Sequence, residues 1–321
     1  MIDETANRTT LSRAHMLGAL AAVGASMRAG RANAQSGPAI RIGASSADSY
    51  AQAHYAYEGG FFSKAGLNVE ITDFPNSQAI VQAAAGGALD IGMADMIQLI
   101  NPIEKGVPFA YFAGGALYRT EAPATLLVVG KSSTIQKPKD LEGQTIGVVA
   151  LTSISSMSVT EWLRQGGANL STIKIFELPF ATMVPAIQRG TCAACFLAEP
   201  FLSGARADLR VLASTYDVIA KQFYIGAWFG QRDYLTKNLD QTKRLIQALY
   251  DAGRWTNTHH DESAAMLAKY TKLDLDRIKT MTRAVWSTSI DPKLMQPVID
   301  IAVRYKAIDK PANAADLIFK G

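Results

Sequence analysis

Short apolar runs alternate with stripes of helical spacing along most of the chain, and residues 74–99 show this pattern most clearly. After the break at Pro75, apolar positions at i, i+1, i+4 and i+5 predict an amphipathic helix that Asn76 or Ser77 can cap. A glycine pair ends this helix, and the mostly apolar run at 89–93 predicts a buried strand before the next helix. This order indicates one crossover of a parallel sheet, in which ligands bind where strands lead into helices.

The same alternation continues on both sides of this stretch. Further apolar runs of strand length occupy residues 40–43, 69–72, 109–112, 125–129, 146–149, 173–178 and 209–213. Helix-like stretches separate these runs, and the chain after Leu239 is predicted to be helical, including residues 275–285. Because strands that alternate with helices form parallel sheets, the predicted fold class is α/β.

The first 34 residues differ in character from the rest. Arg8 and Arg13 precede a weakly apolar run at 15–27, and Ala-Asn-Ala at 32–34 has the form of a cleavage site before Gln35. The run is shorter than the roughly 20 apolar residues that a membrane span needs. We therefore expect an export signal peptide over residues 1–34, with a disordered cytosolic tail as the alternative.

The charge of the chain is close to balanced. The sequence holds 32 Lys and Arg residues against 28 Asp and Glu residues. The predicted signal peptide removes four basic and two acidic residues, which leaves a net charge of +2. There is no basic stripe or long charge run, and this argues against nucleic acid as a partner.

Several motifs stand at corresponding points of the pattern. They are the Gly-Gly-Ala-Leu-Asp-Ile-Gly segment at 86–92, the glycine corner at 59–67, Asp-Leu-Glu-Gly at 140–143 and Glu-Pro at 199–200. With these motifs the chain resembles the periplasmic substrate-binding proteins of ABC importers for aliphatic sulfonates, taurine, nitrate and thiamine-type pyrimidines.

The resemblance implies a two-lobed periplasmic binding protein fold of type II, in which each lobe is a mainly parallel sheet flanked by helices. It places residues 39–129 and 223–321 in lobe 1 and residues 130–222 in lobe 2. It also implies a periplasmic monomer that binds a small molecule without a cofactor or metal. The partner would be an ABC transporter permease in the inner membrane.

Polar and aromatic side chains gather where the predicted strands end. Together with the resemblance, this pattern selects as candidate ligand-binding residues Ser45, Ser46, Asp48, Tyr50, Asn76, Ser77, Asp95, Met96, Leu151, Thr152, Ser153, Phe180, Thr182, Glu199 and Trp228. Each could instead cap a helix, pack in the core or form a surface ion pair. In particular, we expect Ser46, Asp95, Thr152 and Glu199 to line one pocket, with two residues from each lobe.

The chemistry of these candidates leaves the ligand open. Helix N-termini near Ser77 and Ser153 favour an anionic group such as a sulfonate or carboxylate. Asp48, Asp95 and Glu199 favour a ligand with N–H donors or positive charge. An aromatic acid or a pyrimidine would satisfy both, with Tyr50, Phe180 or Trp228 as a stacking wall.

No catalytic motif stands out in the sequence, which lacks a G-x-S-x-G elbow, an H-E-x-x-H pair and a phosphate-binding loop. The alternative function is a pyrimidine-precursor biosynthetic enzyme on the same fold, which would need a reactive histidine and a metal-binding cysteine group. Cys192 and Cys195 are the only cysteines. On one strand they would lie ~10 Å apart, too far for a disulfide, so we expect buried, inert thiols.

Overall fold

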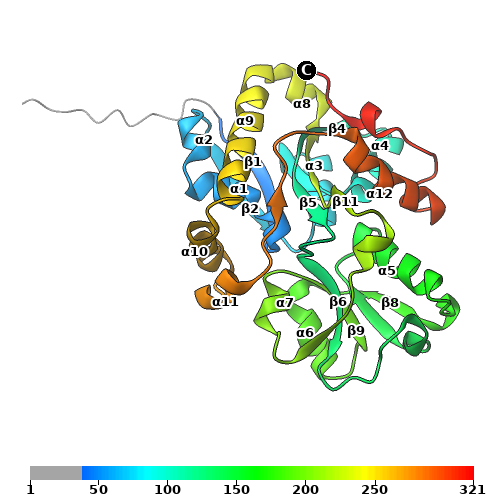
Figure 1. Ribbon diagram of the computed structural model, residues 1–321. Coiled ribbons are helices and arrows are strands. Elements are labelled where there is room, and N and C mark those ends of the chain that lie inside the picture. The colour runs from blue at the N-terminus through cyan, green and yellow to red at the C-terminus, as the bar shows by residue number, and fades with distance from the viewer. Residues whose placement is uncertain (1–37) are drawn as a thin grey trace, which may run out of the picture. The chain divides into compact units, whose positions relative to one another are not determined.

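The computed structural model describes residues 38–321, which form two five-stranded sheets and one three-stranded sheet (Figure 1). The first sheet has the order β2 (Val69–Phe74), β1 (Ile40–Ser45), β3 (Ile91–Ala94), β12 (Ala227–Gln231) and β4 (Phe109–Gly114). The second has the order β10 (Leu209–Ala213), β6 (Thr125–Gly130), β9 (Ala194–Ala198), β7 (Thr145–Val148) and β8 (Lys174–Glu177). The third has the order β11 (Gln222–Tyr224), β5 (Ala116–Arg119) and β13 (Val285–Trp286).

Both large sheets are mainly parallel and contain one antiparallel strand each. In the first sheet β1 runs parallel to β2 and β3, while β12 runs antiparallel to β3 and β4. In the second sheet β7 runs parallel to β8 and β9, while β6 runs antiparallel to β9 and β10. The predicted α/β fold with two mainly parallel sheets is therefore confirmed.

The position of β6 corrects the predicted lobe boundary near residue 129. β6 pairs with β9 and β10, so residues 125–129 belong to the second sheet and not to lobe 1. The chain leaves the first half after β5 and comes back through β11, and these two crossing strands pair with each other. A strand that is apolar on both faces reads the same in either sheet, so the sequence could not place it. We propose that the two lobes correspond to the two large sheets and their helices, with β6 in the second lobe.

The helices flank the sheets and mark the ends of the two halves. They are α1 (Gln52–Glu58), α2 (Phe61–Lys64), α3 (Ser77–Ala85), α4 (Met96–Glu104), α5 (Ile154–Gln165), α6 (Phe180–Gln188), α7 (Phe201–Gly204), α8 (Arg232–Lys237), α9 (Leu239–Thr256), α10 (His260–Thr271), α11 (Leu275–Thr280) and α12 (Pro292–Arg304). Single turns of 3₁₀ helix are η1 (Asp48–Tyr50), η2 (Pro138–Leu141), η3 (Leu170–Thr172), η4 (Thr215–Val218) and η5 (Ala314–Leu317). Over residues 38–321, no helix is long and apolar enough to span a bilayer.

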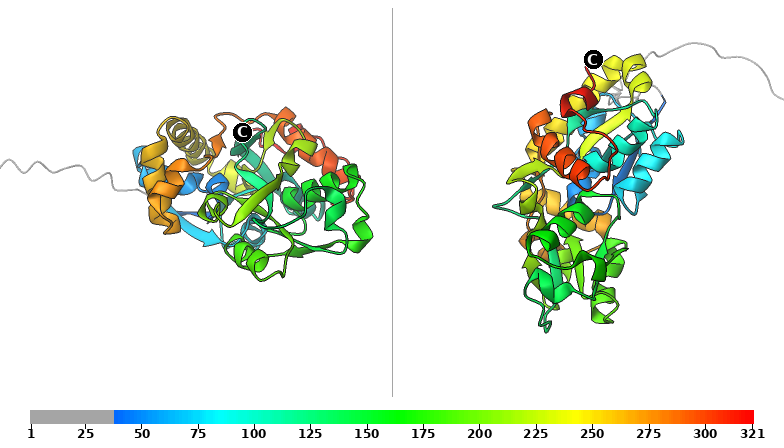
Figure 2. Two further views of the ribbon diagram at one scale, coloured as in Figure 1. Left: turned by 60° about the horizontal axis from the view of Figure 1, so that its bottom comes forward. Right: turned by 90° about the vertical axis from the view of Figure 1, so that its right-hand side faces the viewer.

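The C-terminal helices pack mostly on helices of the first half. α9 lies against α1 and α2, and α12 lies against α4. In addition, α11 touches α7 and α12 touches α5, both of which belong to the second half. The right-hand view of Figure 2 shows the green segment of the chain at the bottom, and most of the blue, yellow and orange segments above it. The prediction of one helix over residues 275–285 is wrong, because α11 ends at Thr280 and Val285 pairs with Leu117 of β5.

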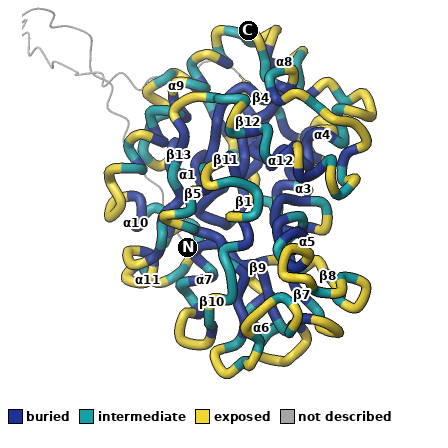
Figure 3. The backbone as a smooth tube through the Cα atoms, turned by 45° about the vertical axis from the view of Figure 1, so that its right-hand side comes forward, coloured by how far each residue is buried: buried dark blue, intermediate teal, exposed yellow. Residues whose placement is uncertain are grey.

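The centres of the two large sheets are the most buried parts of the chain, as the dark blue tube in Figure 3 shows. Every residue of β3, β4 and β9 is buried. α3 packs closely on β3 because Gly92 has no side chain, and a Cβ there would lie 2.3 Å from Cγ2 of Ile80. This close contact fixes where the N-terminus of α3 points.

Candidate ligand-binding cavity

A narrow cavity lies between the two large sheets, where strands β1, β3, β7 and β9 end. Its volume of about 40 Å³ holds a few water molecules or one small polar group. It is lined by Ser45, Ala47, Ser49, Tyr50, Asn76, Ser77, Asp95, Gln98, Thr125, Val149, Ser153, Ile154, Ser155, Phe180, Phe196, Ala198, Tyr216 and Ile225. Both halves of the molecule therefore contribute to it.

Four helices begin at this cavity. Asn76 caps α3 by accepting the Ala79 N–H at 2.9 Å, so the cap is the first of the two predicted candidates, Asn76 and Ser77. Asp95 caps α4 by accepting the Gln98 N–H at 3.0 Å. Ser153 caps α5. α6 begins at Phe180 without a side-chain cap. Since each helix N-terminus carries partial positive charge and N–H donors, the cavity is a favourable place for an anion.

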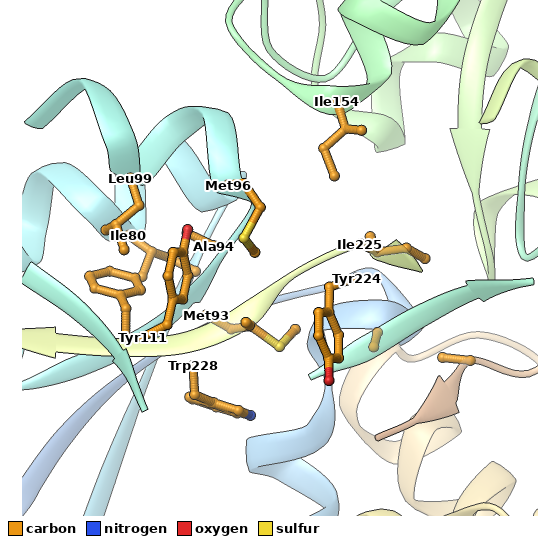
Figure 4. Packing of buried hydrophobic residues seen from close by; sticks show 14 of the residues in the cluster. Ile80, Met93, Ala94, Met96, Leu99, Tyr111, Ile154, Tyr224, Ile225 and Trp228 are labelled. Carbon is orange, nitrogen blue, oxygen red and sulfur yellow. The ribbon is translucent and has the colours of Figure 1, made fainter. Parts of the chain in front are cut away.

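Three hydrogen bonds join the halves at or beside the cavity wall, and one of them runs from the backbone N–H of Asp48 to the carbonyl of Glu199 at 2.9 Å. The backbone N–H of Ile154 donates to Oδ2 of Asp95 at 3.3 Å, and Nδ2 of Asn76 donates to the carbonyl of Val149 at 3.3 Å. Figure 4 shows the Ile154 side chain pointing from α5 toward Ile225 in the first half. The described conformation is thus a closed one, in which polar groups of one half are satisfied by the other.

Asp95 is the only charged residue among the described residues that line the cavity. The residue is 3% exposed, and none of the ion pairs among the described residues includes it. Burial raises the pKa of Asp95 to about 7, although the N–H bonds from Gln98 and Ile154 act in the opposite direction. The group therefore changes its charge near neutral pH, a property that is common at functional sites.

Thr125 supplies an unused hydroxyl to the same cavity. Its side chain is buried, and within residues 38–321 its Oγ1 has no hydrogen-bond partner. Buried polar groups are nearly always paired, so such an exception needs an explanation. A polar group held in the cavity, either water or a ligand, would supply the missing partner.

Aromatic rings close the remaining sides. Phe180 stacks on Phe201 with ring centroids 5.7 Å apart, and Phe196 packs against Tyr216 at 4.9 Å. The Tyr50 hydroxyl donates to the carbonyl of Ile225 at 3.4 Å, and burial raises the pKa of Tyr50, which keeps the phenol neutral. The cavity thus combines an apolar wall with the polar floor made by the helix ends.

Seven of the predicted site residues line this cavity. They are Ser45, Tyr50, Asn76, Ser77, Asp95, Ser153 and Phe180. Their proximity is a finding, while their contact with a ligand stays a prediction.

The prediction that Ser46, Asp95, Thr152 and Glu199 share one pocket is wrong, because Asp95 is the one member of this set that lines the cavity. Glu199 is buried, but its carboxylate accepts the N–H of Ser203 at 2.9 Å and the Ser203 hydroxyl at 2.7 Å. It therefore holds the first turn of α7. Thr152 faces a separate surface groove beside α4, and Ser46 is not part of the lining.

The other predicted residues that lie outside the cavity have clear structural roles or are exposed. Asp48 is paired with Arg283, with Nε to Oδ2 at 3.2 Å. Trp228 donates to Oε1 of Gln52 at 2.7 Å, and Figure 4 shows it across β12 from Ile154. Met96 is buried in the core of the first half, while Leu151 and Thr182 are exposed.

Sequence reasoning missed several lining residues, most of which the second half contributes. Thr125 and Phe196 lie on β6 and β9, whose uniform apolar character gave no sign of a site. Gln98 could have been found, because it stands one turn after the cap residue Asp95. Tyr216 of η4 and Ile225 lie on either side of the crossing strand β11, and only the assembled fold brings both to the cavity.

The two cysteines lie away from the cavity lining. Both are buried and unpaired, and burial raises the pKa of both thiols. The distance estimate for a single strand does not apply, because β9 begins after Cys192. Within the described residues, no three His, Cys, Asp or Glu side chains are placed to hold a metal ion.

Comparison with known proteins identifies the family. A family model described as NMT1/THI5 like matches residues 49–263, about two thirds of the chain, and this span includes most of the cavity lining. The chain belongs to the NMT1/THI5-like family. The resemblance inferred from the sequence motifs is thereby confirmed.

The individual proteins that are similar to this chain in sequence or structure include binding proteins and an enzyme. The taurine-binding periplasmic protein of Escherichia coli (strain K12) is 27% identical over 196 residues, 60% of this chain and 58% of that protein. The periplasmic aliphatic sulphonate binding protein SsuA from Escherichia coli superposes with a TM-score of 0.72 at 22% identity, over 88% of this chain and 98% of that chain. The desulfurization enzyme DSZB superposes with a TM-score of 0.66 at 14% identity, over 88% of this chain and 96% of that chain.

Proposed function

We propose that this member of the NMT1/THI5-like family is the solute-binding component of an ABC importer and captures a small organic anion between its two lobes. The observation that carries the proposal is the cavity, to which both halves contribute and at which four helices begin. Binding that engages both halves favours the closed conformation, because the contacts to both exist only there. The closed protein would then deliver the anion to a permease in the inner membrane.

A sulfonate or a carboxylate fits this cavity better than a neutral pyrimidine. Helix N-termini, serine hydroxyls and the Thr125 hydroxyl are all hydrogen-bond donors, and donors are what an oxoanion needs. The taurine- and sulfonate-binding names of the similar proteins agree with this class. The aromatic wall around Phe180 and Tyr216 would cover the apolar part of the molecule.

Binding without catalysis is the simpler use of this cavity. The described lining has no histidine, cysteine or lysine, and the pyrimidine-enzyme alternative requires a reactive histidine. His54, which lies near the predicted ligand loop, is held by Asp73 at 2.9 Å, and neither residue belongs to the lining. Recovery of an added sulfonate in unchanged form after long incubation with the protein is the expected result.

A thermal-shift experiment with ethanesulfonate, propionate, benzoate and cytosine tests the proposal. An anion at 100 times its dissociation constant should add about 2.7 kcal/mol to the unfolding free energy, and cytosine should add nothing. Stabilisation by cytosine alone would contradict the proposed ligand class.

The variant Ser155→Asp places a negative charge at the start of α5, where it suits the helix but repels an anion in the cavity. Its response to the anions should be lost. Gln241→Glu, in the first turn of α9 and away from the cavity, is the matched control and should respond like the unchanged protein.

A further inference from the structure

Asp95 occupies an unusual position for a carboxylate in an anion site. It is buried at the cavity wall, and both of its oxygens already accept backbone N–H groups, from Gln98 in its own half and from Ile154 in the other. The titratable groups that face it are Tyr50 of η1, Tyr111 of β4 and Tyr216 of η4. Burial raises the pKa of these three phenols, so none of them supplies a charge.

The rest of the cavity is arranged for negative charge. The helices α3, α4, α5 and α6 begin there, and the unpartnered hydroxyl of Thr125 provides independent support for a polar ligand. An ionised Asp95 would repel an anion at this short range, in surroundings that screen charge poorly. A protonated Asp95 would instead offer its O–H as one more donor.

We propose that the cavity takes up its anion together with one proton from solvent, and that this proton stays on Asp95 as a hydrogen-bond donor to the anion. This inference rests on the proposed function, since it specifies the charge state in which the site binds. The raised pKa of Asp95, about 7, means that the empty site is already half protonated at neutral pH. Binding would raise this pKa further, because the anion disfavours the carboxylate.

The alternative is a ligand that carries both an anionic and an ammonium group, with the ammonium paired to ionised Asp95. The two cases predict opposite dependence on pH. If the proton is taken up, affinity falls as pH rises through the pKa of Asp95. If an ammonium group pairs with the carboxylate, affinity rises over the same range.

Calorimetric titration with ethanesulfonate and 2-aminoethanesulfonate from pH 6 to pH 9 separates these cases, because the two probes differ by one ammonium group. For ethanesulfonate we expect affinity about tenfold weaker at pH 8 than at pH 6. The reason is that the fraction of empty protein in which Asp95 is protonated falls by about this factor over that range. Titrations in two buffers of different ionisation enthalpy should show uptake of nearly one proton at pH 8. Tighter binding of 2-aminoethanesulfonate at high pH, without proton uptake, would overturn the inference.

The variant Asp95→Asn keeps the size and the capping ability of the side chain but cannot ionise. It should bind ethanesulfonate with an affinity that no longer changes with pH and without proton uptake. The matched control Asp276→Asn removes an exposed carboxylate on α11 and should keep the full pH dependence. Binding by the unchanged protein that is independent of pH would refute only the role of Asp95, whereas failure of both sulfonates to bind at any pH would refute the proposed function as well.

Discussion

Asp48 and Asp95 are both buried in the first half of the molecule, yet their surroundings differ completely. Asp48 accepts the N–H of Ala284 at 2.7 Å, receives the Tyr55 hydroxyl and pairs with the guanidinium of Arg283. Asp95 receives only backbone N–H groups at its carboxylate and faces a cavity. A buried charge needs a partner of opposite charge or must lose its charge.

The difference separates a carboxylate with a structural ion pair from the one to which we assign a role in binding. Both residues follow strands at the same edge of the first sheet, so position alone gives them equal claims to a binding role. The Asp48 carboxylate accepts hydrogen bonds from Arg283 and Ala284, and these bonds connect η1 to the segment before β13. Asp95 has no ion pair among the described residues, and it lines the cavity.

The largest effect should come from breaking the Asp48 cluster. Arg283→Leu leaves Asp48 buried without a cation, and this should lower the unfolding free energy by about 3–5 kcal/mol. Urea unfolding at pH 7 measures the loss. The double variant Asp48→Asn with Arg283→Leu should recover part of the lost unfolding free energy. Unchanged stability of Arg283→Leu alone would show that Asp48 and Asp95 do not differ as described.

The opposite sign is expected when the charge at Asp95 is removed. The pKa of Asp95 is about 7 in the folded protein and about 3.9 when unfolded, so the native state holds the extra proton and stability falls as pH rises between these values. Asp95→Asn removes this loss and should stabilise the empty protein at pH 8 by up to about 4 kcal/mol. The gain should nearly vanish at pH 3, where Asp95 is largely protonated in both states; a gain of the same size at both pH values would contradict the ionisation argument.

Thr125 tests the cavity without a change in charge. Thr125→Val replaces an unpartnered buried hydroxyl with a methyl group of similar shape, so the stability of the empty protein should stay equal or rise slightly. Loss of a hydrogen bond to an anion should weaken ethanesulfonate binding about tenfold. Thr182→Val, at the exposed start of α6, is the control in the same calorimetric series and should bind normally.

The smallest effect is expected at Glu199, a third buried carboxylate. Burial raises the pKa of Glu199, but its oxygens are satisfied by Ser203 and do not reach the cavity. Glu199→Gln should change ethanesulfonate affinity by no more than about twofold. A larger loss of ethanesulfonate affinity, with an unchanged unfolding free energy, would show that Glu199 takes part in ligand binding.

The sequence by itself determined the class of the fold and located seven of the residues that line the candidate cavity. The apolar runs over residues 40–43, 69–72, 89–93 and 109–112 all became strands of the first sheet, because period and composition are local properties. The caps Asn76, Asp95 and Ser153 could be found for the same reason, since each acts within one turn of its own helix.

Only the tertiary structure decided which of these groups meet. β6 is apolar in either sheet, and its pairing with β9 brings Thr125 to the cavity. Asp48 and Asp95 are equivalent in the pattern until Arg283, which is 235 positions from Asp48, reaches one of them and not the other. A contact over that distance depends on how whole elements pack, and no local pattern in the sequence specifies it.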